Sequence, residues 1–329
     1  MENAKRLKLG ILGLGMGMLR AGELQEDPDA VLTAVCDLDE AKLKEAGEKF
    51  GVRTYSRYEE MLADRDVEAV YIGTPSGTHA ALGIQAARAG KHLLVEKPVD
   101  ADLKAAERLV REARRAGVKL AVCFQSRFTN DVMKVQHGIE AGRFGRLLYG
   151  QISMLWWRTQ EYYDAGGWRG TWKLDGGGAL MNQCIHYIDL AISFFGRPKK
   201  VAGFASTLAH KIETEDTAAF AVTFENGALL SALATTCNFK GSDRTEILVA
   251  GERGSVALAN NAIFRSHFPD ETEGRFDYEP PRRSIYWDIA RAVREDTEPV
   301  ISGEEGLKAI RVIKGVYKSS LTGRAVKLD

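Results

Sequence analysis

The chain has 329 residues, a length typical of two domains of roughly 150 residues each. Lysine plus arginine and aspartate plus glutamate both number 45, so the formal net charge is zero and no basic excess favours nucleic acid or an anionic membrane as partner. A hydrophobic share of 45% with 27% charged residues excludes a disordered chain and favours a globular protein.

The cysteines indicate a reduced environment. They are far apart and show neither the C-x-x-C spacing nor the density of a disulfide scaffold; they are Cys36, Cys123, Cys184 and Cys237. We therefore expect a cytoplasmic protein. No histidine or cysteine cluster has metal-ligand spacing, so no metal site is expected. Lys5, Arg6 and Lys8 followed by an apolar run imitate a signal peptide, but four glycines interrupt that run, and no apolar segment reaches the ~18 residues of a membrane span.

Short apolar runs alternate with amphipathic segments over the first third of the chain. The predicted strands are Leu7–Leu12, Val31–Cys36, Val67–Ile72, His92–Val95 and Val118–Phe124. The predicted helices are Asp39–Phe50, Thr78–Gly90 and Ala101–Gly117. Parallel strands need crossover helices, so this alternation predicts an α/β Rossmann domain over residues 1–123, built on a doubly wound parallel sheet.

The remainder, residues 124–329, has a different pattern. Asp216–Phe224 alternates with period two and places Phe220, Val222 and Phe224 on one face, a Glu-Asn-Gly turn follows, and Ala228–Thr236 runs back as a hairpin partner. Further strands are predicted at Leu147–Trp157, Lys200–Leu208, Arg244–Ala250 and Ser255–Leu258. Helices are predicted at Thr129–Ala141, Ala179–Phe195, Ser284–Glu295 and Glu304–Leu321. We expect an α+β domain with an open, mainly antiparallel sheet.

A glycine-rich turn follows the first predicted strand. Glycines there allow a tight turn and let helix-terminal amides approach a pyrophosphate. The G-x-G-x-x-G pattern is incomplete, because its last position is methionine. The βαβ context nevertheless favours dinucleotide binding over a merely structural turn. The residues expected to bind the cofactor here are Gly13, Gly15, Met16, Gly17 and Met18.

Asp37 closes the second predicted strand, near the expected spacing from the first glycine. A carboxylate there accepts hydrogen bonds from a ribose diol and repels a 2′-phosphate, and Leu38 and Asp39 supply no compensating cation. NAD is therefore expected as the cofactor rather than NADP. The alternative is that Asp37 is only a surface carboxylate starting the next helix.

Several further motifs together resemble the Gfo/Idh/MocA family of oxidoreductases. They are Gly73-Thr74-Pro75, His79, Gly90-Lys91-His92, Glu96-Lys97-Pro98, Gly176-Gly177-Gly178, His186 and Asp189. The resemblance runs from about Leu7 to Leu328, nearly the whole chain. It implies an NAD-binding Rossmann domain and a substrate-binding second domain whose exposed sheet face forms a homo-oligomer, a dimer or tetramer. It also implies that Thr74, Pro75, His79, Glu96 and Lys97 contribute to the cofactor site.

Lys97 immediately follows an apolar strand, at the carboxyl end where ligands bind in open α/β sheets. An ammonium there can stabilise the oxygen that gains charge as hydride leaves the neighbouring carbon. The alternative is an ordinary solvated turn residue. The resemblance identifies Lys97 as the family's catalytic lysine, in contact with the substrate as well.

His186 falls on a predicted polar stripe of a helix, with Asn182, Asp189 and Ser193 at spacings of four, three and four. An imidazole with a pKa of about 6.5 suits proton abstraction from a hydroxyl, although a solvated helix residue is the alternative. Family members acting on inositol carry aspartate where this chain has Asn182, which cannot take a proton. The branch acting on sugar nucleotides such as N-acetylglucosaminuronic acid derivatives also shows Asn-Gln before the histidine, so Asn182 and His186 are expected to bind such a substrate.

Four of the five tryptophans fall within one short segment, interleaved with tyrosines and arginines. Trp168 and Arg169 are expected to bind substrate, with an aromatic face for a sugar and a cation for carboxylate or phosphate. Core packing or an oligomer interface is the alternative for this segment.

These expectations define an NAD-dependent dehydrogenase that acts on the CH–OH group of a sugar, uronic acid, sugar nucleotide or cyclitol. Two alternatives remain: an NAD-retaining glycoside hydrolase of the same fold, which recycles NAD, and a non-catalytic NAD-sensing regulator, which binds it without turnover. Whether Lys97 or His186 is the formal base stays open, because the two titrate as a coupled pair. The substrate, the direction of reaction and the choice between dimer and tetramer stay open as well.

Overall fold

The computed structural model of the protein describes residues 6–269 and 278–328. The chain divides into two compact units. One holds Met1–Cys123 with Arg283–Leu307, and the other holds Phe124–Arg282 with Lys308–Asp329. The predicted division into 1–123 and 124–329 thus differs from these units over residues 283–307. That segment contains a helix that packs on the sheet of the first unit.

The first unit is built on a six-stranded parallel sheet of order β3-β2-β1-β4-β5-β6. Its strands are β1 (Leu7–Leu12), β2 (Ala30–Cys36), β3 (Arg53–Tyr55), β4 (Ala69–Ile72), β5 (His92–Val95) and β6 (Leu120–Val122). The chain builds outward from β1 in both directions, so the order reverses between β1 and β4. In open α/β sheets such a switch point creates the ligand-binding crevice at the carboxyl ends of the strands. The predicted doubly wound sheet is confirmed.

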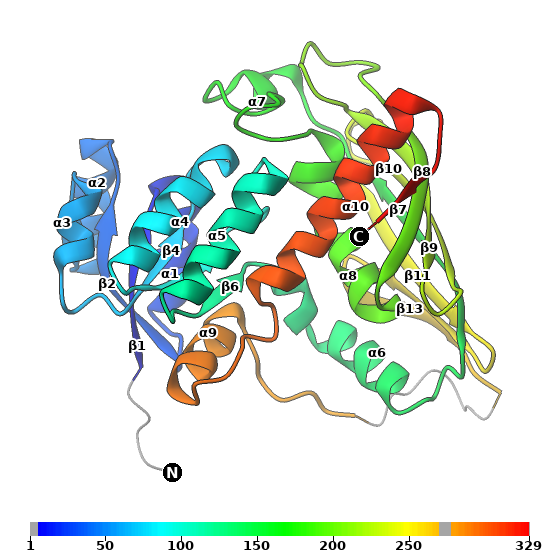
Figure 1. Ribbon diagram of the computed structural model, residues 1–329, viewed down its shortest axis with the longest axis horizontal. Coiled ribbons are helices and arrows are strands. Elements are labelled where there is room, and N and C mark those ends of the chain that lie inside the picture. The colour runs from blue at the N-terminus through cyan, green and yellow to red at the C-terminus, as the bar shows by residue number, and fades with distance from the viewer. Residues whose placement is uncertain (1–5, 270–277, 329) are drawn as a thin grey trace. The chain divides into compact units, whose positions relative to one another are not determined.

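Helices connect these strands (Figure 1), and a further helix from later in the chain packs on the same sheet. They are α1 (Leu14–Leu24), α2 (Glu40–Phe50), α3 (Tyr58–Ala63), α4 (His79–Arg88), α5 (Leu103–Arg115) and, from the later segment, α9 (Ile285–Arg294). The last of these contacts β2, β5 and β6. Among these helices, α3 was not predicted from the sequence. Asp102 caps α5 by accepting a hydrogen bond from the amide of Ala105, which satisfies one of the free amides at a helix start.

The second unit is built on an eight-stranded sheet of order β13-β12-β11-β7-β10-β9-β8-β14. The strands are β7 (Leu147–Leu155), β8 (Pro198–Ser206), β9 (Thr217–Phe224), β10 (Leu229–Thr235), β11 (Arg244–Gly251), β12 (Ser255–Ala259), β13 (Ala262–His267) and β14 (Val326–Lys327). All neighbours are antiparallel except β7 and β10, which pair in parallel. The predicted mainly antiparallel sheet is therefore confirmed.

One face of this sheet is covered by helices and the other is open. The helices of the second unit are α6 (Asn130–Glu140), α7 (Gln160–Asp164), a π-helix (Ala179–Cys184) and α8 (Ile185–Phe195). Phe195 of α8 stacks on Phe224 with ring centroids 5.3 Å apart. Phe220, Val222 and Phe224 are all buried on this face, as predicted.

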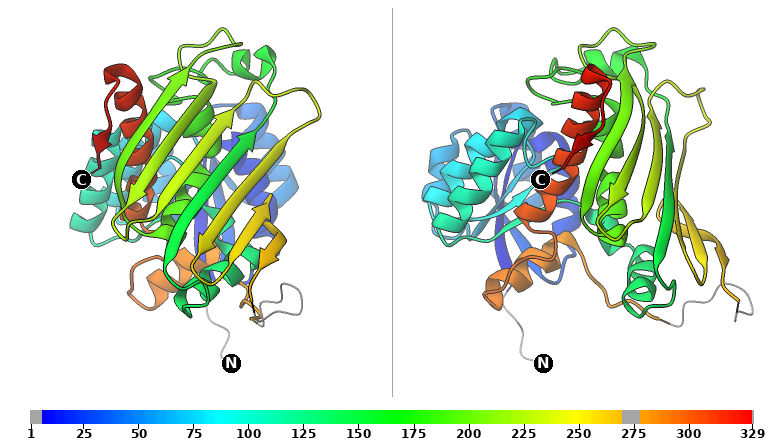
Figure 2. Two further views of the ribbon diagram at one scale, coloured as in Figure 1. Left: turned by 90° about the vertical axis from the view of Figure 1, so that its right-hand side faces the viewer. Right: turned by 45° about the vertical axis from the view of Figure 1, so that its right-hand side comes forward.

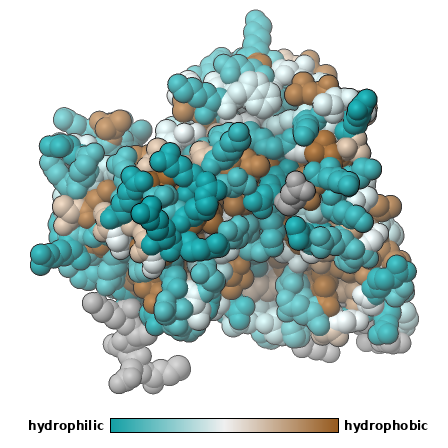
Figure 3. All heavy atoms as spheres, viewed as in Figure 1, coloured by the Kyte–Doolittle hydropathy of each residue, from teal (hydrophilic) through white to brown (hydrophobic). Residues whose placement is uncertain are grey.

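The left view of Figure 2 looks onto the open face of the sheet, where no described helix of the second unit lies. Large apolar side chains are exposed on its strands, namely Tyr149, Phe204, Leu229, Leu233 and Phe264. In the direction viewed in Figure 3, by contrast, hydrophilic side chains predominate and apolar ones are scattered. The sheet thus exposes large apolar side chains together with polar ones such as Gln151, Arg244 and Arg265.

Helix α10 (Gly303–Thr322) begins in the first unit and ends in the second. Gly306 packs closely on Val122 of the first unit, and Gly315 packs on Val201 of the second. Across the described residues, no helix combines the length and apolarity needed to cross a membrane.

Candidate functional site

The turn between β1 and α1 contains three glycines that meet three different steric demands. Gly13 has a φ of 90°, and a Cβ there would lie 2.9 Å from the backbone of Gly73. No atom lies within 4 Å of the Cβ position of Gly15, so the turn faces open space there. A Cβ on Gly17 would lie 2.7 Å from Ile11 Cγ2, so this residue permits close packing of helix on strand. A dinucleotide-binding turn needs all three features.

Gly17 also explains why the incomplete glycine pattern still folds as a Rossmann turn. The pattern expects its last glycine at position 18, where the chain has Met18. Gly17, one residue earlier, allows the close packing of helix on strand that this last glycine usually provides. Met16 lies in the first turn of α1, where amides have no partner within the helix. Met18 lies in the next turn, where amides belong to the helical ladder. The structure therefore favours Met16 over Met18 as a backbone donor to a pyrophosphate.

Asp37 follows β2 and brings its carboxylate to this turn. Its Oδ2 accepts a hydrogen bond from the amide of Leu14 at 2.5 Å, and its Oδ1 accepts one from the amide of Asp39 at 2.9 Å. Asp39 itself caps α2, accepting from the amides of Ala41 and Lys42. The alternative that Asp37 serves only to start that helix is therefore wrong. Its half-buried carboxylate stands where the ribose of a dinucleotide lies in Rossmann folds.

His79 starts α4 and is only 1% exposed. Its Nδ1 lies 2.8 Å from Pro98 O, and its Nε2 lies 2.8 Å from Thr74 O. The ring thus joins the loops that follow β4 and β5. Because both nitrogens face loop carbonyls, His79 supports the loop of Thr74 and Pro75, and its contribution to a cofactor site stays a prediction.

Glu96 is likewise a supporting residue. It is 8% exposed, and its Oε1 accepts hydrogen bonds from Arg20 Nη2 at 2.8 Å and from the Tyr71 hydroxyl at 2.9 Å. Burial alone would raise the pKa of Glu96, but the Arg20 guanidinium and the nearby Lys97 outweigh burial, and the pKa is lowered. The carboxylate is therefore charged and engaged with protein donors, and its contribution to a cofactor site stays a prediction.

Lys97 stands one residue beyond this anchored carboxylate. Glu96 Oε2 accepts a hydrogen bond from the Lys97 amide at 3.2 Å. The lysine side chain is half-buried and begins at the carboxyl end of β5, where ligands bind in this class of sheet. A buried ion pair thus fixes the backbone from which the predicted catalytic ammonium extends.

His186 lies in the first turn of α8 and is half-buried. Its ring meets the Phe124 ring edge to face, with centroids 5.8 Å apart. One helical turn on, Asp189 is 1% exposed and forms a bidentate ion pair with Arg127, at 2.7 Å from Nε to Oδ2 and 2.6 Å from Nη2 to Oδ1. The helix that bears the predicted proton acceptor is thus anchored by a buried charge pair.

The predicted polar stripe through His186 is wrong in two respects. Residues Ala179–Cys184 form a π-helix, whose wider turn removes the α-helical spacing between Asn182 and His186. Asp189 is buried rather than solvated. Asn182 Nδ2 donates to Asp175 Oδ1 at 2.7 Å, so in this arrangement one of its donors is used within the protein.

The three glycines before this segment admit another backbone. A Cβ on Gly178 would lie 2.0 Å from Glu215 O. The Glu215 carboxylate is buried, and it accepts hydrogen bonds from the amides of Gly178 and Leu180 and from the Tyr317 hydroxyl. Burial raises the pKa of Glu215 to about 7. Close packing therefore accounts for two of the three glycines, Gly178 on Glu215 and Gly177 on Tyr317, and Gly176 has a positive φ of 78°.

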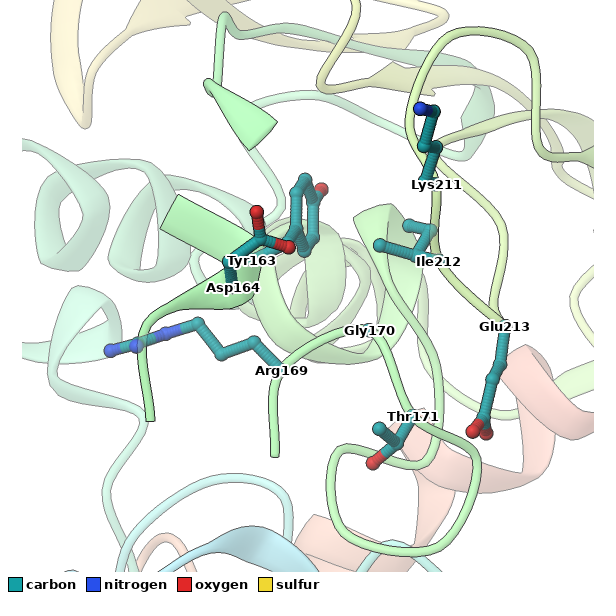
Figure 4. Close-up of a pocket in the computed structure, with 8 residues that line it drawn as sticks. All are labelled: Tyr163, Asp164, Arg169, Gly170, Thr171, Lys211, Ile212 and Glu213. Atoms are coloured by element: carbon teal, nitrogen blue, oxygen red, sulfur yellow. The ribbon is translucent and has the colours of Figure 1, made fainter. Parts of the chain in front are cut away.

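Arg169 lies on the tryptophan-rich segment and faces a pocket of about 370 Å³ within the second unit. Its guanidinium stacks on the rings of Tyr162 and Trp168, 4.8 Å from each centroid. Figure 4 shows that the pocket also presents Lys211 and two acidic side chains, Asp164 and Glu213. Trp168 supports Arg169 and does not itself line the pocket.

The predicted residues fall on both units. Asp37 and Lys97 belong to the first, and Asn182, His186 and Arg169 belong to the second. Sequence reasoning missed the buried charges that support them: Arg20, Arg127 and Glu215. A signal existed for Arg20, because it lies between Gly17 and Leu24 on the buried side of α1. A charge at such a position needs a buried partner.

A doubly wound sheet, a glycine turn and an acid after β2 define a dinucleotide-binding protein. Similarity to known proteins agrees with this class. Residues 7–124 match the family described as "Oxidoreductase family, NAD-binding Rossmann fold", and residues 132–257 match the GFO/IDH/MocA C-terminal domain. The chain belongs to the Gfo/Idh/MocA oxidoreductase family.

Similar proteins span the whole chain. The crystal structure of the WlbA dehydrogenase from Bordetella pertussis in complex with NADH and UDP-GlcNAcA is 33% identical, has a TM-score of 0.89 and covers 99% of each chain. The corresponding WlbA complex from Chromobacterium violaceum is also 33% identical, with a TM-score of 0.88, over 98% of this chain and 96% of that one. The myo-inositol 2-dehydrogenase of Thermotoga maritima is 28% identical over 98% of this chain and 99% of its own.

Proposed function

We propose that this protein is an NAD-dependent dehydrogenase that oxidises a secondary alcohol of a sugar-type substrate, or reduces the corresponding ketone. The observation that carries the proposal is the placement of Lys97 at the carboxyl end of β5, on a backbone anchored by Glu96, in a unit with a complete dinucleotide turn. Family membership supports the reaction class.

In the oxidative direction the alcohol carbon loses hydride and its hydroxyl loses a proton, which together convert CH–OH to C=O. Bound NAD supplies the hydride acceptor. The Lys97 ammonium stabilises negative charge on the substrate oxygen, and His186 receives the proton at an imidazole nitrogen. Whether Lys97 or His186 acts as the formal base stays open.

The substrate class that we favour is a sugar nucleotide or uronic acid. The two WlbA relatives, which are 33% identical, were solved with UDP-GlcNAcA. Arg169 and Lys211 line one pocket together with Asp164 and Glu213, and we propose that the two cations bind a carboxylate or phosphate of the substrate. Asn182 has one amide donor on Asp175, and we propose that the amide orients the substrate.

The deciding experiment is an NADH absorbance assay with purified protein and a panel of sugars, uronic acids, UDP-sugars and cyclitols. Stoichiometric NADH formation with one class supports the proposal. Glycoside cleavage without net NADH would instead establish the hydrolase. Tight NAD binding with no turnover on any class would favour the regulator.

Asp37 is expected to make the protein prefer NAD over NADP by at least roughly tenfold in affinity, or about 1.4 kcal/mol. Its carboxylate stands at the turn and repels a 2′-phosphate. Calorimetric titration with both cofactors measures the preference. Asp37→Ser should weaken the binding of NAD and reduce the difference in affinity between NAD and NADP. Equal affinities in the unmodified protein would contradict the cofactor assignment.

The open sheet face is proposed to bind a second copy of the chain. Leu229 and Leu233 of β10 are 56% and 42% exposed beside Tyr149 and Phe204, and an apolar surface of this kind marks an interface. Light scattering at micromolar concentration should give at least twice the chain mass of 36.2 kDa. Leu233→Arg should reduce that mass, and a monomeric unmodified protein would refute the interface.

A further inference from the structure

Three side chains with metal-binding atoms converge in the second unit, outside the dehydrogenase residues described above. His210 lies in the loop between β8 and β9, Asp216 directly precedes β9, and Cys237 follows β10. Their ligand atoms all lie within 4.8 Å of one another. The positions are too far apart in sequence to match a short metal motif, which is why the sequence predicts no such site.

The distances fit a tetrahedral zinc site. His210 Nδ1 lies 3.1 Å from Asp216 Oδ2 and 3.8 Å from Cys237 Sγ. Ordinary zinc bond lengths and a tetrahedral angle place nitrogen about 3.4 Å from oxygen and about 3.6 Å from sulfur. The N···O separation is about 0.3 Å shorter than this ideal and the N···S separation about 0.2 Å longer, and all three ligand atoms lie within 4.8 Å of one another. One ion can therefore reach all three atoms after small side-chain adjustments.

The hydrogen bonding of His210 leaves its Nδ1 to meet Asp216 and Cys237 through either a proton or a metal ion. Its Nε2 lies 2.9 Å from Arg158 O, and a carbonyl can only accept, so Nε2 carries a proton. In the neutral ring, Nδ1 then directs a lone pair at the carboxylate of Asp216 and towards the sulfur of Cys237. Lone pairs that converge in this way need a proton or a metal ion between them. The arrangement is not that of a catalytic Cys–His–Asp triad. In such a triad one ring nitrogen faces the cysteine and the other faces the aspartate, whereas here both residues lie at Nδ1.

Neighbouring backbone groups hydrogen-bond to His210 and Asp216, as is usual for residues that bind a metal ion. The Arg158 carbonyl orients the imidazole, as backbone carbonyls do for metal-binding histidines. The amides of Leu208 and Ala209 donate to Asp216 at 2.8 and 2.9 Å. The side chains of His210 and Asp216 are 8% and 0% exposed, so an ion would enter on the side of Cys237, which is half-buried.

We propose that His210 Nδ1, Asp216 Oδ2 and Cys237 Sγ bind one Zn²⁺ ion, with solvent at the fourth position. A thiolate with an imidazole favours zinc over Mg²⁺ or Ca²⁺. The thiol of Cys237 gives its proton to solvent when the ion binds.

The ion has a structural consequence for the neighbouring pocket. It joins the 207–216 loop to the end of β10, and the same loop carries Lys211 and Glu213 at the pocket wall. Tyr163, also at that wall, packs against the His210 ring with centroids 4.8 Å apart. The site stands independently of the dehydrogenase reaction, because none of its three residues takes part in the proposed chemistry.

Cobalt titration of the full-length metal-stripped protein tests the proposal. One Co²⁺ per chain should bind with a near-ultraviolet thiolate-to-cobalt absorption band. In Cys237→Ser the band should be lost, because its sulfur is the source of the band. In both Cys237→Ser and His210→Ala the affinity for Co²⁺ should fall about 10²-fold or more, since even outer-shell changes cost 10- to 100-fold. His267→Ala is the matched control, a histidine outside the cluster on the edge strand β13, and should behave like the unmodified protein. Circular dichroism of each variant without metal establishes that it is folded.

A second measurement needs no variant. Cys237 is half-buried, whereas the other three cysteines are buried, so an alkylating reagent should modify it first. Zn²⁺ should slow that modification and Mg²⁺ should not. Absence of stoichiometric Co²⁺ binding, a band that survives Cys237→Ser, or alkylation unaffected by Zn²⁺ would overturn the proposal and identify the cluster as an ion pair of protonated His210 with Asp216.

Discussion

Lys97→Met and His186→Ala are each expected to lower turnover by about 10²-fold or more while NAD affinity and thermal stability stay nearly unchanged, the usual scale for losing an electrostatic or proton-transfer group. Lys97 lies at the carboxyl end of β5 and His186 in the first turn of α8, and both side chains are only half-buried. Removing either therefore leaves little new buried cavity. Steady-state kinetics on the identified substrate, with calorimetric NAD titration, measures the effect.

Matched control variants distinguish the loss of a catalytic group from the general effect of replacing a lysine or a histidine. Lys104→Met and His267→Ala change a lysine of α5 and a histidine of β13 that lie outside the proposed site and should leave turnover intact. Asn182→Ala should be milder than His186→Ala, because positioning is lost while the proton acceptor remains. Near-normal turnover in both the Lys97 and the His186 variants would refute the proposed site even with fold and cofactor correct.

Arg20→Met is expected to reduce the free energy of unfolding by about 3–5 kcal/mol, the cost of leaving a buried charge without its partner. The side chains of Arg20 and Glu96 are 6% and 10% exposed, and the carboxylate that remains would have only the Tyr71 hydroxyl and the Lys97 amide as donors. Because the folded-state pKa of Glu96 is lowered, the pair stabilises the fold above the ordinary carboxyl value of 4.5 and loses that contribution as the pH falls.

Urea unfolding at neutral pH measures the loss. Arg20→Met combined with Glu96→Gln should recover part of it, since no unpaired carboxylate then remains buried. Arg114→Met is the control, because its ion pair with Glu304 is 73% and 48% exposed and should contribute at most about 1 kcal/mol. A small loss in Arg20→Met, equal to that in the control, would show that the buried pair is not needed for stability.

Local patterns sufficed for most of the fold. The buried strands of the first unit were predictable because parallel strands are apolar on both faces and end at glycine or polar residues. β3 (Arg53–Tyr55) was missed because it is a short, largely exposed edge strand. The parallel pairing of β10 with β7 joins segments far apart in the chain, and neither strand carries a local signal for its distant neighbour.

The candidate site likewise has parts that the sequence predicts and parts that only the structure reveals. The glycine turn and Asp37 follow from spacing within one βαβ unit. The partners of Glu96 and Asp189 lie 76 and 62 residues away, so the supporting role of these carboxylates emerges only in three dimensions. The π-helix before His186 arises where Gly178 packs against Glu215, a contact that periodicity cannot reveal.

The late position of α9 has a consequence for folding on the ribosome. This helix buries Ile285, Tyr286 and Ile289 and contacts β2, β5 and β6, yet it is synthesised about 160 residues after β6, a delay of roughly 8 to 30 s at ordinary translation rates. During that interval the apolar surface that α9 later covers is open to chaperones and to other nascent chains. A stop codon before residue 283 would leave this surface open permanently, so a fragment that ends after β6 is expected to associate through the apolar surface that α9 covers in the full chain.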